Sequence, residues 1–248
     1  MKKFLALILA ILMVLSLAAC GESKRSSKKE KKNNTNVATE VATEEETENN
    51  FDIVTEAPTS GNIDISINDD GIEFGNLEEH SFTNRDIGIG IVVPSDWTTK
   101  SVDEIATLNG TDADTMLNDF ESHMSKAQVA YMFYSSDNST GNNINITLEN
   151  LAMTNNAGIN GEEYLELAKK TLKAAFDQMG ATDVSTNITT IEIDGKTFDC
   201  IEIDSVVSGV ELTQLQIVVP LGDYMAGITF TATDLDAFGY IDDYIYTL

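Results

Sequence analysis

The sequence has few of the residues that most catalytic and metal sites require. Its 248 residues include two histidines, His80 and His123, and two cysteines, Cys20 and Cys200. It contains no His-Glu-x-x-His motif, no Gly-x-Ser-x-Gly motif and no glycine-rich phosphate loop. A zinc site would therefore need carboxylate ligands, and a catalytic thiol would lack a histidine in a triad-like setting. We expect no catalytic residue, no metal site and no cofactor.

Basic residues are also scarce. The chain has 15 Lys and Arg against 41 Asp and Glu, which gives a net charge of −26. Residues 33–79 contain no Lys or Arg at all. A strongly acidic protein repels nucleic acid and anionic lipid, so no nucleic-acid partner is expected. Solubility alone would also explain this charge.

The acidic residues do not form a recognisable calcium loop. Counting from Ser66, Asn68 and Asp70 puts Leu77 at the twelfth position, where a calcium loop has glutamate. Paired carboxylates for glycoside cleavage meet in space rather than in sequence, so the sequence leaves an envelope hydrolase of that kind open.

The chain begins like a secreted protein. Residues 1–3 are positively charged, and residues 4–19 form an apolar run that is too short for the ~20 residues of a membrane span. The run ends at residues 17–20 (LAAC), which resemble the bacterial lipobox. The resemblance implies that residues 1–19 are a signal peptide and that Cys20 carries lipid chains such as palmitate. An ordinary secretory signal with an incidental cysteine is the alternative.

Residues 20–62 indicate a lipidated cysteine followed by a flexible, charged stalk. They contain few large apolar residues and have no useful period, so they cannot bury a core. Six cations follow Cys20 closely: Lys24, Arg25, Lys28, Lys29, Lys31 and Lys32. Each would gain ~1 kcal/mol beside an anionic membrane surface, although a merely solvated linker is equally compatible with the composition.

The remainder of the chain divides into a short ribbon and a globular domain. Residues 63–77 alternate apolar and polar residues around a turn, which predicts a hairpin or an edge ribbon. The globular domain is expected over residues 78–248. Its pattern predicts two strands, short helices over 101–109 and 112–124, two strands, a helix over 161–179, four strands and a final helix from about 234.

Individual segments of this domain carry more specific signals. Asn160 and Glu163 form a capping box for the long helix, and the Asp194-Gly195 pair predicts a tight hairpin. Irregular alternation between Phe198 and Ile203 indicates a bulge. Cys200 lies in the same apolar run, so we expect a buried, inert thiol.

The segment IGIVVPSDW, residues 89–97, is similar to the strand–Pro–x–x–Trp opening of PsbP-like domains. The long helix, the meander after it and a terminal helix that is expected to follow ITFTATDLDAF also match that pattern. The resemblance implies an α+β fold, an antiparallel β-sheet with helices packed on both faces. It also implies an accessory or binding role, because most members of the family are not enzymes. No metal-ligand residue of the family can be matched here.

These features together predict a membrane-anchored extracytoplasmic lipoprotein that acts as a non-catalytic binding or accessory module of the cell envelope. Its partners would be the membrane, through the lipid on Cys20, and an envelope protein or cell-wall component. The alternatives are an envelope hydrolase that uses paired carboxylates and a lipoprotein that binds a small solute or cation.

Overall fold

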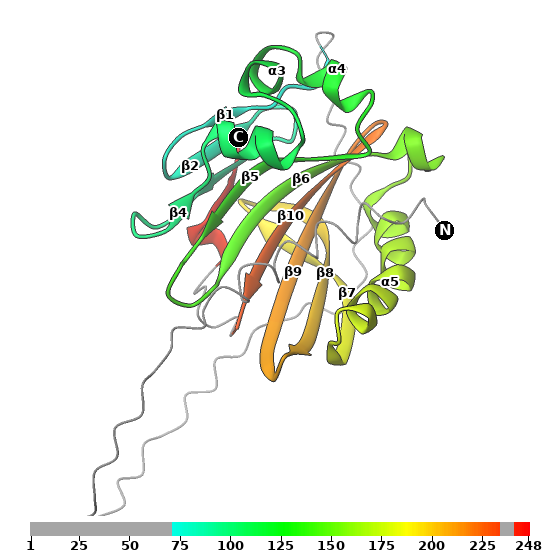
Figure 1. Ribbon diagram of the computed structural model, residues 1–248. Helices are drawn as coiled ribbons and strands as arrows, with labels where there is room; N and C mark the ends of the chain where they lie inside the picture. The colour runs from blue at the N-terminus through cyan, green and yellow to red at the C-terminus, as the bar shows by residue number, and fades with distance from the viewer. Residues whose placement is uncertain (1–70, 234–240) are drawn as a thin grey trace, which may run out of the picture.

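The computed structural model describes residues 71–233 and 241–248, which form two antiparallel sheets and several helices (Figure 1). The expected signal peptide, the stalk and most of the 63–77 ribbon lie outside the described residues. The larger sheet has seven strands, in the spatial order β4 (Thr98–Thr99), β5 (Val129–Ser136), β6 (Asn143–Asn150), β10 (Tyr224–Ala232), β9 (Val210–Leu221), β8 (Lys196–Val207) and β7 (Thr182–Ile193). The smaller sheet has the order β1 (Asn76–Leu77), β2 (Ser81–Asn84), β3 (Ile89–Val92) and β11 (Ile245–Thr247).

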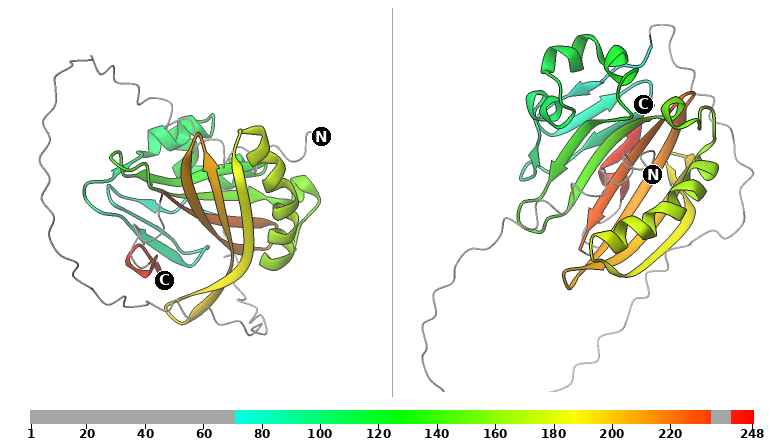
Figure 2. Two further views of the ribbon diagram at one scale, coloured as in Figure 1. Left: turned by 90° about the horizontal axis from the view of Figure 1, so that it is seen from below. Right: turned by 45° about the vertical axis from the view of Figure 1, so that its right-hand side comes forward.

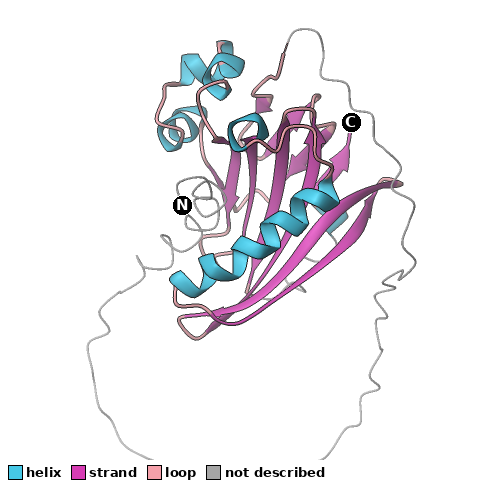
Figure 3. Cartoon of the chain, turned by 90° about the vertical axis from the view of Figure 1, so that its right-hand side faces the viewer, coloured by secondary structure: helices cyan, strands magenta, loops and turns pink. Residues whose placement is uncertain are grey.

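Helices contribute to both faces of the larger sheet. The long helix α5 (Gly161–Gln178) crosses one face diagonally (Figure 3). The smaller sheet lies on the opposite side (Figure 2), where the core also takes in side chains of α2 (Val102–Leu108), α3 (Ala113–Asn118) and α4 (Phe120–Met124). The described residues also include two short 3-10 turns, η2 (Leu151–Thr154) and η4 (Ile241–Asp243). The predicted α+β fold with an antiparallel sheet is thus confirmed. Within these residues, no helix combines the length and apolarity that crossing a membrane requires.

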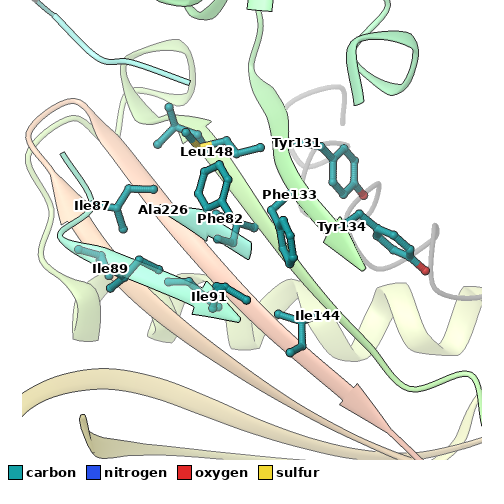
Figure 4. Packing of buried hydrophobic residues seen from close by; sticks show 14 of the residues in the cluster. Phe82, Ile87, Ile89, Ile91, Tyr131, Phe133, Tyr134, Ile144, Leu148 and Ala226 are labelled. Carbon is teal, nitrogen blue, oxygen red and sulfur yellow. The ribbon is translucent and has the colours of Figure 1, made fainter. Parts of the chain in front are cut away.

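The core between the two sheets is built on aromatic contacts. The ring of Phe120 on α4 contacts Phe74, Phe74 contacts Phe82 on β2, and Phe82 contacts Phe133 on β5, with centroid separations of 5.7, 6.2 and 5.7 Å. Edge-on and tilted ring pairs of this kind add to the stabilisation from buried area. Figure 4 shows Phe82 and Phe133 among the isoleucines of β3. The chain of rings joins a short helix, the small sheet and the large sheet.

The helix α5 forms as the sequence predicts. The side chain of Asn160 accepts a hydrogen bond from the Glu163 N–H at 2.9 Å, and Glu163 accepts one from the Asn160 N–H at 3.3 Å. This reciprocal pair satisfies donors that a helix start leaves unpaired. The buried face of α5 includes Leu165, Leu172 and Phe176, which share a hydrophobic cluster with Ile201 and Ile203 of β8.

The irregular alternation in β8 has a different cause from the predicted bulge. The pairing of β8 with β9 runs without a break from Asp199 to Val207, and the register shift lies in β7, between Thr182 and Ser185. Phe198 and Cys200 face the small sheet, whereas Ile201 and Ile203 face α5. Both faces of β8 are buried, and for that reason its sequence lacks an alternating pattern.

A second correction concerns β5. The sequence pattern puts Tyr131 and Phe133 on one side, but a bulge between them turns Tyr131 to the face that bears Tyr134. Figure 4 shows both tyrosine rings pointing away from Phe82. The bulge coincides with two hydrogen bonds from the Asn109 side chain: its amide N–H donates to the Tyr131 carbonyl at 2.8 Å, and its Oδ1 accepts from the Tyr131 N–H at 2.7 Å. Asn109 therefore replaces a strand neighbour at this position.

Both ends of the globular domain also differ from the sequence pattern. The predicted last helix is absent over residues 241–248, where η4 leads into β11 and β11 pairs with β3. Residues 234–240 lie outside the described part of the chain. The predicted helix over 112–124 is two helices, divided at Asp119. At the other end, Ile72 and Phe74 precede the expected start at residue 78, yet both are buried in the main core.

Truncation of a core residue of α5 tests the packing of this helix on the sheet. Leu172 is fully buried, so Leu172→Ala removes apolar contacts and leaves a cavity, and we expect a loss of about 2–5 kcal/mol in the free energy of unfolding. Leu167→Ala is the matched control on the same helix, because Leu167 is 41% exposed and its truncation should cost less than about 0.5 kcal/mol. Urea denaturation of both variants measures the difference. Equal losses would show that α5 is not packed as described.

Candidate functional site

The sheet face that carries α5 also carries the polar groups of the candidate site. The one residue to which the sequence assigns a role, Cys20, lies outside the described residues. The two histidines are on separate elements, His80 before β2 and His123 on α4. In the described ranges 71–233 and 241–248, no three His, Cys, Asp or Glu residues are grouped so that they could hold a metal ion.

Two carboxyl groups on this face have raised pKa values. Burial raises the pKa of Glu149 on β6, and the Tyr164 hydroxyl donates a hydrogen bond to its Oε2 at 2.8 Å, which partly opposes the shift. Burial also raises the pKa of Asp199 on β8, the negative charge of Glu162 adds to that effect, and a hydrogen bond from the Glu162 backbone N–H opposes it. Both carboxyls therefore hold a proton more tightly than an exposed acid would.

Both carboxyl groups are engaged with the first turns of α5. Tyr164 lies on the helix, and Asp199 faces Gly161, where a Cβ atom would overlap the Asp199 carboxylate. Glu149 and Asp199 belong to β6 and β8, which are separated by β10 and β9. Asp199 shares a cross-strand row with Thr147, two residues before Glu149, and three strand spacings separate β6 from β8. The contacts of both carboxyls seat the start of α5 on the sheet.

Beside α5 the same face bears two rows of neutral polar side chains, each running across four strands. The first row is Ser136, Asn143, Thr231 and Gln214, and the second is Tyr134, Asn145, Thr229 and Gln216. We call these eight residues the polar rows. On β8 the rows continue into Ile203 and Ile201, which belong to the cluster under α5. The polar rows therefore begin where the contact surface of α5 ends.

The polar rows are buried. Asn143 and Asn145 are each 2% exposed, and Thr229 is the only member of the rows that is half-buried rather than buried. Gln214 donates a hydrogen bond to the Thr231 hydroxyl at 3.0 Å, and the Gln216 side chain lies over Gly227. Buried amides and hydroxyls of this kind are normally paired, because burial removes their bonds to water.

Three atoms of the polar rows lack such a pair. The side-chain oxygens of Asn143 and Asn145 and the hydroxyl of Tyr134 are buried and form no hydrogen bond with good geometry. Burial raises the pKa of Tyr134 to about 12, and the nearby Ser136 side chain offsets only part of that shift, so the phenol is neutral at physiological pH. A buried acceptor left unpaired costs ~1–3 kcal/mol. An external donor at Asn143 and Asn145 would recover this free energy.

Sequence reasoning missed the polar rows, although a signal for them is present. Asn143, Asn145 and Thr147 alternate with Ile144 and Ile146, which ordinarily indicates a strand with one solvent-facing side. The structure instead buries the polar side of β6. The signal in the sequence is that three successive outward positions of this central strand hold asparagine or threonine rather than charged residues.

Cys200 occupies the opposite face of the sheet. It is 1% exposed, and burial together with the charges of Asp199 and Glu202 raises the pKa of its thiol to about 12. The prediction that this cysteine is buried is confirmed. A thiol with so high a pKa is a poor nucleophile at neutral pH.

Comparison with known proteins gives weak structural matches. No protein-family model and no curated protein sequence matches the chain. The solution structure of cyanobacterial PsbP (CyanoP) from Synechocystis sp. PCC 6803 is similar over 70% of this chain and 96% of its own, at 10% identity and a TM-score of 0.39. A crystal structure from Bacteroides thetaiotaomicron VPI-5482 is similar over 69% of this chain and 49% of its own, at 13% identity and a TM-score of 0.32.

Replacement of Glu149 by glutamine tests the cost of burying its carboxylate. Because burial raises the pKa of Glu149 in the folded protein, the stability that its protonated form supports is lost as the pH rises through that raised pKa. Glutamine cannot ionise and can still accept the bond from Tyr164. We therefore expect Glu149→Gln to gain stability relative to the parent protein between about pH 4 and about pH 8, in urea titrations at each pH.

The control for this prediction is Glu166→Gln, on the exposed side of α5. Comparing both variants with the parent at each pH removes the effect of the net charge of −26, which all three proteins share to within one unit. The control should differ from the parent by less than about 0.5 kcal/mol. A Glu149→Gln variant that becomes relatively less stable as the pH rises would contradict the burial of this carboxylate.

Proposed function

We propose that this protein is an extracytoplasmic lipoprotein, held on the cell membrane by lipid on Cys20, whose PsbP-like domain acts as a non-catalytic binding or accessory module of the envelope. The single observation that carries the anchoring is the apolar run of residues 4–19 ending in LAAC at residues 17–20. Burial of an acyl chain contributes ~0.8 kcal/mol per CH₂, and two chains retain a protein where one does not. The cations after Cys20 supply further attraction to an anionic surface.

The binding role is supported by the buried polar face. The unpaired oxygens of Asn143 and Asn145 are atoms that a bound molecule could satisfy. The two carboxyls with raised pKa values, Glu149 and Asp199, are both occupied with the start of α5. The proposed partner is an envelope protein or a cell-wall component, and the acidic composition disfavours nucleic acid.

Substitution of the anchoring cysteine tests the membrane attachment. Cys20→Ser removes the only thiol that the lipobox can present, so we expect the protein to move from the membrane fraction to the soluble fraction, with no acyl mass at its N-terminus. Cys200→Ser is the control, because that thiol is buried in the core and should leave fractionation unchanged. Intact mass spectrometry of the parent protein measures whether Cys20 carries lipid and whether residues 1–19 have been removed. An unmodified Cys20, or residues 1–19 still attached, would refute the anchoring.

The binding role has its own test. The full-length, lipidated protein in detergent is incubated with isolated cell-wall material and with solubilised membranes. We expect one of these fractions to retain the protein saturably, with no accumulation of a released product. Turnover of envelope material without saturable retention would instead favour the hydrolase alternative.

A further inference from the structure

The strand β7 is a long edge of the larger sheet. It has twelve residues and stands at one end of the strand order. Its turn to β8, Asp194-Gly195, has two residues with positive φ, so its last residue, Ile193, forms a hydrogen-bonded pair with β8. Counting back from there, the backbone groups of Thr186, Ile188 and Thr190 point away from β8. Among the described residues these groups have no backbone hydrogen-bond partner.

This edge lacks most of the features that keep edge strands from pairing. Natural edge strands are commonly short, or they carry lysine, proline or a bulge. The other sheet ends in the described part of the chain are short: β4 and β1 have two residues each and β11 has three. β7 contains no Lys, Arg, Pro or Gly, and residues 184–191 (VSTNITTI) are uncharged and rich in β-branched side chains. Such an edge can accept another strand.

The accessible part of the edge is its middle. β11 approaches the end of β7, where the Thr247 N–H donates a hydrogen bond to the Asp194 carboxylate at 2.7 Å. At the start of β7 the pairing with β8 is irregular before Ser185. Thr190 is exposed. A partner strand therefore has residues 185–190 to pair with.

The middle of β7 is complementary to a second copy of itself. An antiparallel pair centred on Ile188 sets Ile188 opposite the same residue of the second copy, and Thr186 opposite Thr190. Cross-strand pairs of β-branched side chains are favourable. Residues that face each other in this pair are an even number of positions apart in the sequence, whereas Asp183 and Glu192 are an odd number apart. These two acids therefore never face each other directly.

The helix α5 carries a second self-complementary feature beside the same edge. Tyr164 marks the flank of α5 toward β6, because its hydroxyl donates a hydrogen bond to a carboxyl group on β6. The opposite flank, toward β7, bears the charged side chains of Glu162, Glu166, Lys169 and Lys173. Each of them lies about 140–180° around the helix from Tyr164, at ~100° per residue. We call these four residues the charged row.

Pairing of two β7 edges would bring two charged rows together in antiparallel directions. Glu162 then faces Lys173 of the second copy, and Glu166 faces Lys169, so every pair has opposite charges. The middle of the row is ~16 Å before the end of α5, and Ile188 is ~20 Å after the start of β7. Because α5 runs back along β7 (Figure 3), the two centres lie at nearly the same level.

The separation of the two helices also suits this arrangement. α5 packs on side chains of both β7 and β8, including Ile188 and Ile201. One strand spacing from the symmetry axis to each helix puts the two helix axes ~10 Å apart. Packed helices in proteins are typically ~8–10 Å apart. The helices therefore meet without preventing the strands from pairing.

We infer that β7 is the interface of a symmetric dimer, in which the β7 strands of two copies pair antiparallel about Ile188 and the charged rows of the two α5 helices face each other. The larger sheet then continues through both copies. The net charge of −26 opposes association at long range, but the Debye length of ~8 Å at physiological ionic strength limits that repulsion. The inference does not depend on the proposed lipid anchor or on the binding role.

Cysteine cross-linking tests the register of this interface. The full-length protein is coexpressed in two differently tagged forms, Thr186→Cys and Thr190→Cys, purified in detergent and oxidised. Opposed Cα atoms in such a pair are ~5.5 Å apart, which a disulfide can span, so we expect a linked product that contains both tags. Either variant alone should give no such product, because equivalent residues would be displaced by ~13 Å along the strands. The parent protein, with Cys20 and Cys200 only, gives the background.

Charge reversal on α5 tests the second contact, with sedimentation velocity of the full-length protein in detergent as the measurement. Glu166→Lys sets a cation opposite Lys169 of the second copy, so we expect it to weaken the dimer by about tenfold. Adding Lys169→Glu should restore the dimer. Adding Lys170→Glu instead gives the same net charge on the outer side of the helix and should not restore it.

Several results would overturn the inference. They are a protein that sediments as a monomer and gives no linked product, equal cross-linking by either cysteine variant alone, linkage of the edge cysteines to a different protein, and equal dimerisation of the two double variants. Circular dichroism and the urea midpoint establish that each variant folds. If either threonine variant does not fold, Ile188→Cys replaces the pair, because this residue faces itself across the symmetry axis.

Discussion

The fold depends on the burial of both faces of the seven-stranded sheet. An antiparallel sheet commonly turns one face to water, but here the small sheet covers one side and α5 covers part of the other. β8 shows the consequence most clearly, because Cys200 and Ile201, neighbours in the chain, are buried in two different clusters. At ~25 cal/mol per Å² of apolar area, two buried faces supply far more stabilisation than one. Burial on both faces stabilises the four-strand meander from β7 to β10.

The helix α5 covers only part of its face of the sheet. The helix contacts β7, β8 and β9, and the same face continues across β10, β6 and β5 as the polar rows. If these positions were apolar they would extend the core, and if they were charged they would be solvated. They are amides and hydroxyls that are buried and in part unpaired, as at Asn145. An amide oxygen that is buried without a partner costs stability, so this part of the face contributes less to folding than the part under α5.

Much of the architecture was predictable because local physical rules determined it. The capping box at Asn160, the Asp194-Gly195 turn and the period-two pattern of β6 each fixed an element that the structure contains. The failures came from contacts between elements distant in the sequence. Asn109 stabilises a bulge in a strand that begins twenty residues later along the chain, and burial on two sides removes the alternation from β8. No local pattern carries that information.

The C-terminal segment also shows that a local sequence pattern does not determine contacts between distant elements. Ile241 and Ile245 have a spacing that a helix would also produce, yet Ile245 pairs with Ile91 of β3 and is buried in the smaller sheet. The edge of β3 offered unpaired backbone groups, and pairing with them outweighed helix propensity, which is a weak preference in a short segment. The polar rows were missed for a related reason: alternation in β6 distinguishes two faces but does not say that the polar face is buried. The candidate site thus follows from tertiary placement of ordinary residues, and only Cys20, the proposed anchor, can be read directly from the sequence.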